Sequence, residues 1–295
     1  MATFRIVNLG DSVPWGQGLL EHEKYDSLVK DVLQPKFAGG VSLERLAHSG
    51  AIIGAHGGSG GPAPGEVPVP LPSVIEQCDR FTNSPETVDL VLVNGGINDV
   101  EIQIILDPLV SLSPRIERAC HAGMLTLLGN VGKKFSGPSC QILVTGYFII
   151  LSHLSDPLKI GRLLNMHGIH SPALGKIEKA LGLFNPFLER CLRFFNESND
   201  KLQQAVQETN DPRIKFVPSG FTAANAMFAG EAFLWGLDHD LNPEDPIAAE
   251  RKPQCDLAFP ATNVVRRLTC HRASAGHPNP AGAVQYKNRI LAAMV

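Results

Sequence analysis

Short apolar runs, each closed by glycine or by polar residues, recur along the chain and are typical of buried strands. Four of them are nearly continuous in apolar character, and one alternates between apolar and polar positions. Continuous runs favour strands buried on both faces, as in parallel sheets. The pattern therefore predicts five strands, over Phe4–Leu9, Val41–Leu46, Val88–Val93, Gln141–Thr145 and Arg213–Val217.

Amphipathic stretches separate these strands and predict helices. A serine followed three residues later by glutamate predicts a helix start at Ser73. Other helices are expected over Leu19–Leu33, Pro186–Asn210 and Pro278–Val295. Strands that alternate with helices indicate the α/β class, with right-handed βαβ units and a parallel sheet covered on both faces.

The chain contains no internal repeat or linker that would divide it, so we expect one domain over residues 1–295. An apolar insertion is expected around residues 147–185, beside the carboxyl edge of the sheet. The charge-poor stretch Gly54–Pro72 is rich in glycine and proline and predicts a long surface loop.

Composition excludes several classes of protein. With 44% hydrophobic and 19% charged residues the chain is not of the disordered type. Its net charge of −3 gives no electrostatic drive toward nucleic acid, and its 6% aromatic content disfavours stacking platforms for single strands. No apolar stretch reaches the roughly 18 residues of a membrane span. We therefore expect neither nucleic-acid binding nor stable membrane insertion, while the oligomeric state is open.

The cysteines lack CxxC spacing, so the sequence predicts no metal site, and no organic cofactor is implied either. Cys255 and Cys270 are near enough in sequence to close one loop in an oxidising environment, and whether they do is open. The first residues lack a signal-peptide layout, which favours a cytoplasmic location, although a secreted mature form is not excluded.

Polar segments follow three of the predicted strands, and a fourth precedes the last helix. The first three are Gly10-Asp-Ser12, Ser49-Gly50 and Gly96-Ile-Asn-Asp99, and the fourth begins at His277. All should reach the carboxyl edge of a parallel sheet, where ligands bind. Ser12 could act as a nucleophile if a base takes its proton, and His277 could be that base. Asp11 is then a turn or cap residue.

Acyl transfer also needs donors for the oxyanion of its tetrahedral intermediate. Gly50 lets a backbone N–H approach a substrate, and Asn98 carries an uncharged side-chain donor. The alternatives are that Gly50 only makes a tight turn and that Asn98 only caps a helix.

The four segments together resemble the signature blocks of the SGNH (GDSL-type) hydrolases, a family of esterases and lipases. Leu9-Gly-Asp-Ser12, Ser49-Gly50, Gly96-Ile-Asn-Asp99 and His277 stand in the order of that family's blocks and span most of the chain. The resemblance implies a three-layer α/β/α, flavodoxin-like fold with a central, mostly parallel five-stranded sheet. It also implies Ser12 as the nucleophile and an oxyanion hole made by the Ser12 and Gly50 amides with Asn98.

One position departs from the family pattern. The family usually has an aspartate three residues before its histidine, and here that position is Ser274. We therefore predict a Ser12–His277 dyad whose ring is oriented by a main-chain carbonyl or by Ser274. Without a facing carboxylate, the pKa of His277 should lie near its reference of about 6.5. The alternative is a carboxylate from a nearby acidic segment, for which the candidates are Asp238, Asp240, Glu244, Asp245 and Asp256.

These features predict a serine esterase or lipase that cleaves small-molecule or lipid esters through an acyl-enzyme. The apolar insertion would contact the acyl chain, or would only cover the sheet. One alternative is a catalytically inactive, ligand-binding member of the same fold. Another is a nucleotide- or phosphate-binding protein that uses the turn Gly10–Gly18, although this turn lacks both common phosphate-binding spacings, and Asp11 would repel a phosphate.

Overall fold

A five-stranded parallel sheet forms the centre of the molecule. The computed structural model describes residues 3–54, 63, 65–166 and 177–294, and of residues 164–166 and 177–184 it describes the backbone alone. The strand order is β2-β1-β3-β4-β5 and every pairing is parallel, as in flavodoxin-like sheets. The strands are β1 (Phe4–Leu9), β2 (Val41–Arg45), β3 (Leu90–Val93), β4 (Gln141–Thr145) and β5 (Ile214–Val217). The predicted fold class and five-stranded sheet are confirmed.

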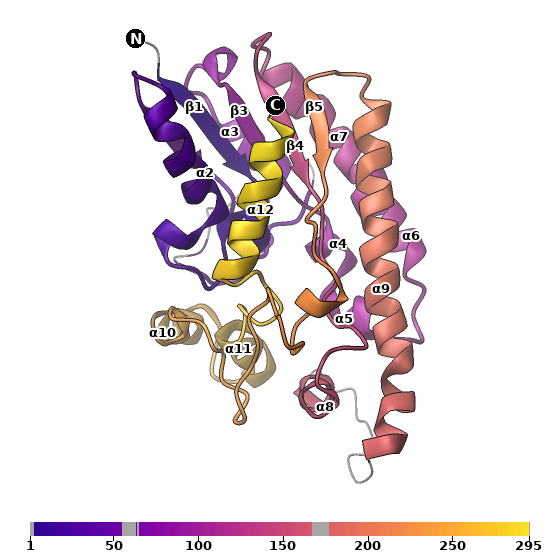
Figure 1. The fold of residues 1–295 in the computed structure, drawn as a ribbon. Helices are drawn as coiled ribbons and strands as arrows, with labels where there is room; N and C mark the ends of the chain where they lie inside the picture. The colour runs from indigo at the N-terminus through magenta and orange to yellow at the C-terminus, as the bar shows by residue number, and fades with distance from the viewer. Residues whose placement is uncertain (1–2, 55–62, 64, 167–176, 295) are drawn as a thin grey trace.

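Helices cover both faces of this sheet and give a three-layer arrangement (Figure 1). On one face α2 (Tyr25–Leu33) packs against α12 (Pro280–Ala293). On the other face α7 (Met124–Lys134) packs between α3 (Val74–Arg80) and α9 (Ile177–Glu208). Because the sheet is covered on both sides, all four residues of the central strand β3 are fully buried.

Short elements gather around the carboxyl edge of the sheet and around its outer helices. The short α-helices are α1 (Ser12–Trp15), α4 (Ile97–Val100), α5 (Ile102–Leu106), α6 (Ser113–Ile116), α8 (Pro157–Met166), α10 (Ala248–Ala258) and α11 (Val264–His271). A π-helix, Glu117–Gly123, joins α6 to α7, and 3₁₀ turns span Glu21–Glu23, Gln34–Lys36, Pro85–Thr87 and Ala223–Asn225. Figure 1 places α10 and α11 beside the beginning of α12.

The predicted helix start at Ser73 is confirmed, because Ser73 and Glu76 form a capping box. The helix expected from Leu19 begins only at Tyr25, since Lys24 is extended and a 3₁₀ turn precedes it. The helix expected from Pro186 begins earlier, at Ile177, and Pro186 lies inside it. Proline lacks an N–H but its φ suits a helix, so it does not mark a start on its own. The helices between β3 and β4 were not predicted.

The prediction of a surface loop over Gly54–Pro72 is wrong for part of its length. Residues 55–62 and 64 lie outside the described residues, but Glu66 and Val67 are buried. Val67 packs against Cys255 and Cys270, which form a disulfide joining α10 to α11. The loop therefore returns to the interior beneath these two helices.

The segment around residues 147–185, predicted as an apolar insertion, begins directly after β4. Tyr147, Phe148 and Leu151 belong to the main core, and α8 contributes Ile160 and Leu163 to it. Residues 167–176 lie outside the described residues. Within the described part of the chain, no helix is long and apolar enough to cross a membrane.

The turn after β1 is held by a buried glutamine from α3. Gly10 donates its N–H to Gln77 Oε1 at 2.7 Å, and Gln77 Nε2 donates to Gly10 O at 2.9 Å. Gly10 has φ +147°, and a Cβ there would lie 2.6 Å from the backbone oxygen of Asn94. The turn therefore needs glycine, and its polar groups need Gln77.

Replacement Gln77→Ala should lower the free energy of unfolding by about 1–3 kcal/mol, because the buried Gly10 N–H loses its partner. Urea denaturation measures this loss. Gln207→Ala, at an exposed position of α9, is the control and should change stability by less than about 0.5 kcal/mol. Equal stability of the two variants would contradict this role for Gln77.

Candidate active site

Ser12 stands at the first turn after β1, an inner strand of the sheet. Asp11 caps the short helix α1 by accepting the Val13 N–H at 2.9 Å, as the sequence indicates. Ser12 itself is 4% exposed and lines a cavity. The sheet therefore brings this hydroxyl to its carboxyl edge.

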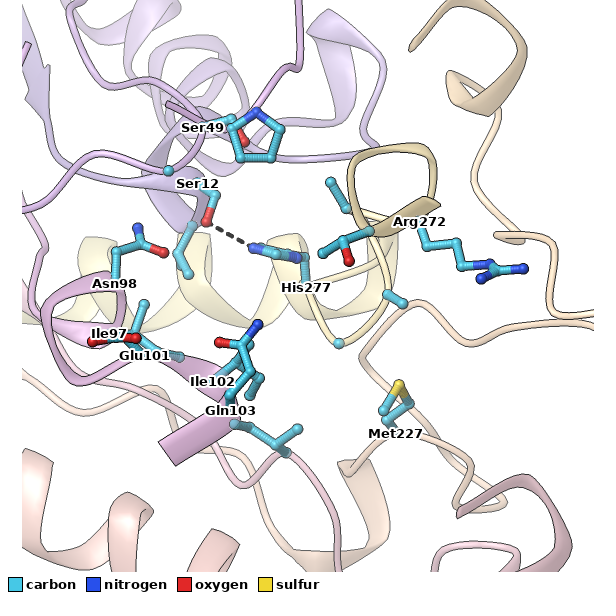
Figure 2. Close-up of a pocket in the computed structure, with 18 of the residues that line it drawn as sticks. Ser12, Ser49, Ile97, Asn98, Glu101, Ile102, Gln103, Met227, Arg272 and His277 are labelled. Atoms are coloured by element: carbon cyan, nitrogen blue, oxygen red, sulfur yellow. Dashed lines mark hydrogen bonds between the residues drawn. The ribbon is translucent and has the colours of Figure 1, made fainter. Parts of the chain in front are cut away.

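His277 reaches the same place from the other end of the chain. It lies in the turn before α12, where its N–H donates to Ser274 O at 2.8 Å and its C=O accepts from Trp235 N at 2.8 Å. Its Nε2 lies 2.7 Å from Ser12 Oγ. Figure 2 shows the imidazole pointing at the hydroxyl across the cavity. The structure thus brings together the two residues predicted to form a dyad.

The second ring nitrogen of His277 is buried and has no hydrogen-bond partner among the described residues. Burial lowers the pKa of His277 from 6.5 to about 4, and the positive charge of Arg251 acts in the same direction. The nearby backbone carbonyls, chiefly that of Ser274, partly offset this effect. The ring is therefore neutral at pH 7, and its pKa lies below the value near 6.5 expected from the sequence.

The acidic candidates for orienting the ring are engaged elsewhere. Asp238 accepts from Asn242 and from Asp240 N, and Asp240 lies beside His239; all are on the surface. Asp256 pairs with Arg267 and orients His271 instead, at 2.8 Å. These three predicted orienting residues are thus wrong, because Nδ1 of His277 accepts or donates no hydrogen bond within the described structure.

The Ser274 side chain does not orient the ring directly either. Its hydroxyl donates to Asp245 Oδ2 and makes no hydrogen bond to the imidazole within the described residues, whereas its backbone carbonyl raises the pKa of His277. Of the acidic candidates, Asp245 alone is linked to the His277 turn by a hydrogen bond that the described residues show.

The three residues predicted to donate N–H groups to an oxyanion all line the cavity. No described residue accepts a hydrogen bond from the backbone N–H of Ser12 or of Gly50. Gly50 has φ +83°, and a Cβ there would lie 2.6 Å from Val69 N, so this position requires glycine. Asn98 Nδ2 donates to Ala51 O at 2.9 Å, which fixes the amide and leaves its second hydrogen available. Ser12, Gly50 and Asn98 line one cavity.

The expectation that Asn98 caps a helix is not met, because Gly96 is the N-cap of α4 and Asn98 lies inside it. The following carboxylate, Asp99, accepts from Ile53 N at 2.9 Å. This bond ties α4 to the segment that follows Gly50. Burial raises the pKa of Asp99.

Tyr147 is a supporting residue that the sequence did not reveal. Its hydroxyl donates to Asp11 Oδ2 at 2.9 Å and accepts from Ile97 N at 2.9 Å. Burial raises the pKa of Asp11 to about 6. Tyr147 thereby joins the Ser12 turn to the Asn98 helix. It is the second residue after β4, and that position near a strand end is the signal that could have found it.

The cavity beside Ser12 has a volume of about 310 Å³ and a mainly apolar wall. The predicted apolar segment supplies Phe148, Ile150 and Leu163, and α4 and α5 supply further apolar side chains. Thr269 of α11 and Arg272, which follows this helix, also line the cavity. Within the described residues, no cluster of three or more His, Cys, Asp or Glu side chains could hold a metal ion.

Neither a protein-family model nor a curated protein matches this sequence. Solved structures do resemble it. The lipase Lip_vut3 from a goat rumen metagenome is 13% identical, aligns over 99% of this chain and 97% of its own, and has a TM-score of 0.51. A variant of Axe2, an acetyl xylan esterase from Geobacillus stearothermophilus, is 12% identical over 99% and 94% of the two chains, with a TM-score of 0.46. A GDSL-like lipase from Bacteroides ovatus is 12% identical over 100% and 99%, with a TM-score of 0.43. The first likeness shows a shared fold over nearly the whole chain.

The environment of His277 predicts its titration. In the native protein its NMR resonances should titrate near pH 4, against about 6.5 in the urea-unfolded chain. Because the unfolded chain takes up this proton at the higher pH, His277 should lower stability as the pH falls from about 6.5 to about 4. A native pKa of His277 at or above 6.5 would contradict the structure, since it would require either a ring exposed to water or an anionic group beside the ring.

Proposed function

We propose that this chain, whose fold is that of the SGNH hydrolases, is a serine esterase that cleaves carboxylic esters through an acyl-enzyme. The observation that carries the proposal is the 2.7 Å contact between Ser12 Oγ and the neutral imidazole of His277. A serine hydroxyl becomes a competent nucleophile when a base lies within hydrogen-bond distance. The turn after β1 and the turn before α12, which lie near opposite ends of the chain, provide that contact.

In the acylation step, Ser12 Oγ attacks the ester carbonyl while Nε2 of His277 takes the hydroxyl proton. The imidazolium then gives this proton to the leaving alcohol, and the C–O bond of the ester breaks. A water molecule reverses the sequence: His277 takes its proton, the hydroxide attacks the acyl carbon, and Ser12 leaves with the proton restored. Every proton in these steps passes through Nε2 of His277, so no carboxylate has to gain or lose a proton.

Stabilisation of the oxyanion falls to the N–H groups of Ser12, Gly50 and Asn98. Fixed donors of this kind are each worth roughly 3–4 kcal/mol in a water-excluded site. Support comes from the unpartnered N–H groups of Ser12 and Gly50 and from the anchored amide of Asn98. Two hydrogen bonds hold the segments that carry these donors: Val69 N donates to Ser49 O at 3.0 Å, next to Gly50, and Asn98 Nδ2 donates to Ala51 O at 2.9 Å.

The apolar cavity favours an ester with an apolar acyl group. The apolar side chains of Phe148, Ile150 and Leu163 line this cavity, and an acyl chain would pack against them. The lipase-like reading of the apolar segment is the one that these contacts support.

Replacement Ser12→Ala tests the central claim. Hydrolysis of a p-nitrophenyl ester should fall by at least about 10³-fold, because the nucleophile is lost. Ser111→Ala, at an exposed position far along the chain, is the matched control and should retain full activity. Undiminished hydrolysis by folded Ser12→Ala protein would refute the proposal. A wild-type protein that binds esters but neither cleaves them nor reacts with a fluorophosphonate would establish the inactive, ligand-binding alternative.

Acyl-chain length provides a second test. From acetyl to hexanoyl esters, kcat/KM should rise about fourfold per methylene, in keeping with about 0.8 kcal/mol for each buried CH₂. Leu163→Trp should move the optimum to shorter chains by narrowing the cavity. Leu158→Trp, on the exposed face of the same helix, should leave the optimum in place. A preference for acetyl groups on sugars over all longer acyl esters would overturn the assignment of an apolar acyl substrate.

A further inference from the structure

The turn that carries His277 is anchored through Ser274. Ser274 is fully buried, and its hydroxyl donates to Asp245 Oδ2. Its backbone oxygen accepts the His277 N–H at 2.8 Å. Asp245 is also buried, and its Oδ2 forms an ion pair with Arg251 Nη2 at 2.5 Å. The position that holds an acid in the resembling family is thus occupied by a hydroxyl whose partner is an acid from another segment.

The segment that carries Ser12 is anchored to the same guanidinium. Arg251 is fully buried, and its Nη1 donates to Glu66 Oε2 at 2.8 Å. The other oxygen of Glu66 accepts the Gly18 N–H at 2.8 Å, in the turn that follows α1. That turn is joined to Ser12 itself, because Gln17 donates its N–H to Ser12 O at 3.1 Å.

Direct packing supports the same connection. Gly18 has φ +82°, and a Cβ built there would lie 2.8 Å from Cβ of Ser274 and 3.0 Å from Cβ of Asp245. The Ser12 turn therefore touches the His277 turn at the point where the hydrogen bonds join them. A side chain at this position would push the two turns apart.

We propose that the chain of hydrogen bonds Gly18–Glu66–Arg251–Asp245–Ser274, which we name the buried tie, sets the distance between Ser12 and His277. This inference rests on the proposed function. Ser274, Asp245, Arg251 and Glu66 are positioning residues: none contacts the reacting atoms. A carboxylate hydrogen-bonded to the imidazole would hold the ring in place directly. The buried tie instead holds the turn that carries the ring.

Charge and burial make the buried tie rigid. The planar guanidinium presents separate donors to two carboxylates in a fixed geometry, and charge-assisted bonds of this kind are the strong ones. Buried charges that lose a partner are strongly unfavourable, so the carboxylates have few other arrangements open to them. A misplacement of about 1 Å between reacting groups can lower a rate about 10²-fold.

Ser274→Ala is the most direct test, because it removes one hydroxyl and leaves the Asp245–Arg251 pair intact. We expect kcat for a p-nitrophenyl ester to fall tenfold or more, KM to change by less than about twofold, and the rate of fluorophosphonate reaction at Ser12 to fall with kcat. Asp245→Asn and Glu66→Gln, which keep the shape of the side chains, carry the same expectation if Ser274→Ala does not fold.

Asp256→Asn is the matched control. It removes a carboxylate that pairs with Arg267 and His271 between the same two helices, α10 and α11, but that does not reach Ser274. Its kcat should equal that of the wild type. Unchanged kcat in folded Ser274→Ala and Asp245→Asn protein, or an equal loss in Asp256→Asn, would overturn the buried tie.

A readout without turnover separates the two proposals. The ¹⁵N resonance of His277 Nε2 reports its hydrogen bond to Ser12, and it should shift in Ser274→Ala but not in Asp256→Asn. If the folded wild type reacts with no fluorophosphonate, the proposed esterase function fails, and this resonance still decides the buried tie. An unmoved resonance in Ser274→Ala would overturn the tie whatever the activity.

Discussion

The hydrogen bond between Ser12 and His277 is the contact on which the candidate site depends. It joins residues 265 positions apart in the chain, so nothing local can form it. The parallel sheet makes the contact possible, because β1 delivers Ser12 to the same carboxyl edge that the turn before α12 reaches. Small errors in either turn would change the distance between the two atoms. The rest of the site can be understood as the means of holding that distance.

A carboxylate on the imidazole would both orient the ring and stabilise its positive form, and loss of such a group in a triad costs about 10⁴-fold in kcat. Here burial and the charge of Arg251 favour the neutral ring, and backbone carbonyls near Ser274 only partly offset them. In the proposed mechanism, the transfer of the Ser12 proton therefore depends on the position of the ring more than on a charge facing it. The buried carboxylates of Glu66 and Asp245 form ion pairs with Arg251 and do not contact the imidazole ring. In this arrangement, buried carboxylates position His277 without stabilising its positively charged form.

The sequence was sufficient for the sheet because its strands are continuous apolar runs whose burial is a local property, as β3 and β4 illustrate. It was sufficient for bringing Ser12 and His277 together because parallel strands share one carboxyl edge. It failed for the acid that is linked to the His277 turn, because exposed Asp238 and buried Asp245 look alike in a loop-like acidic segment. Only packing distinguishes them.

The buried tie shows a second limit of sequence reasoning. Arg251 lies inside an unremarkable polar helix, and no periodicity marks it as buried. Glu66 offered a signal that could have been used, since it is a lone charge within a stretch of glycine, proline and apolar residues. A single charge in such surroundings needs a partner if the loop returns to the interior. The partner itself, 185 positions away, could not be identified without the fold.

A crystal structure of the protein after reaction with a fluorophosphonate would test the account most directly. We predict phosphorus bonded to Ser12 Oγ, a phosphonyl oxygen within hydrogen-bond distance of the Ser12, Gly50 and Asn98 donors, and His277 Nδ1 facing backbone carbonyls. An adduct at another residue, or a carboxylate moved into hydrogen-bond distance of Nδ1, would contradict it.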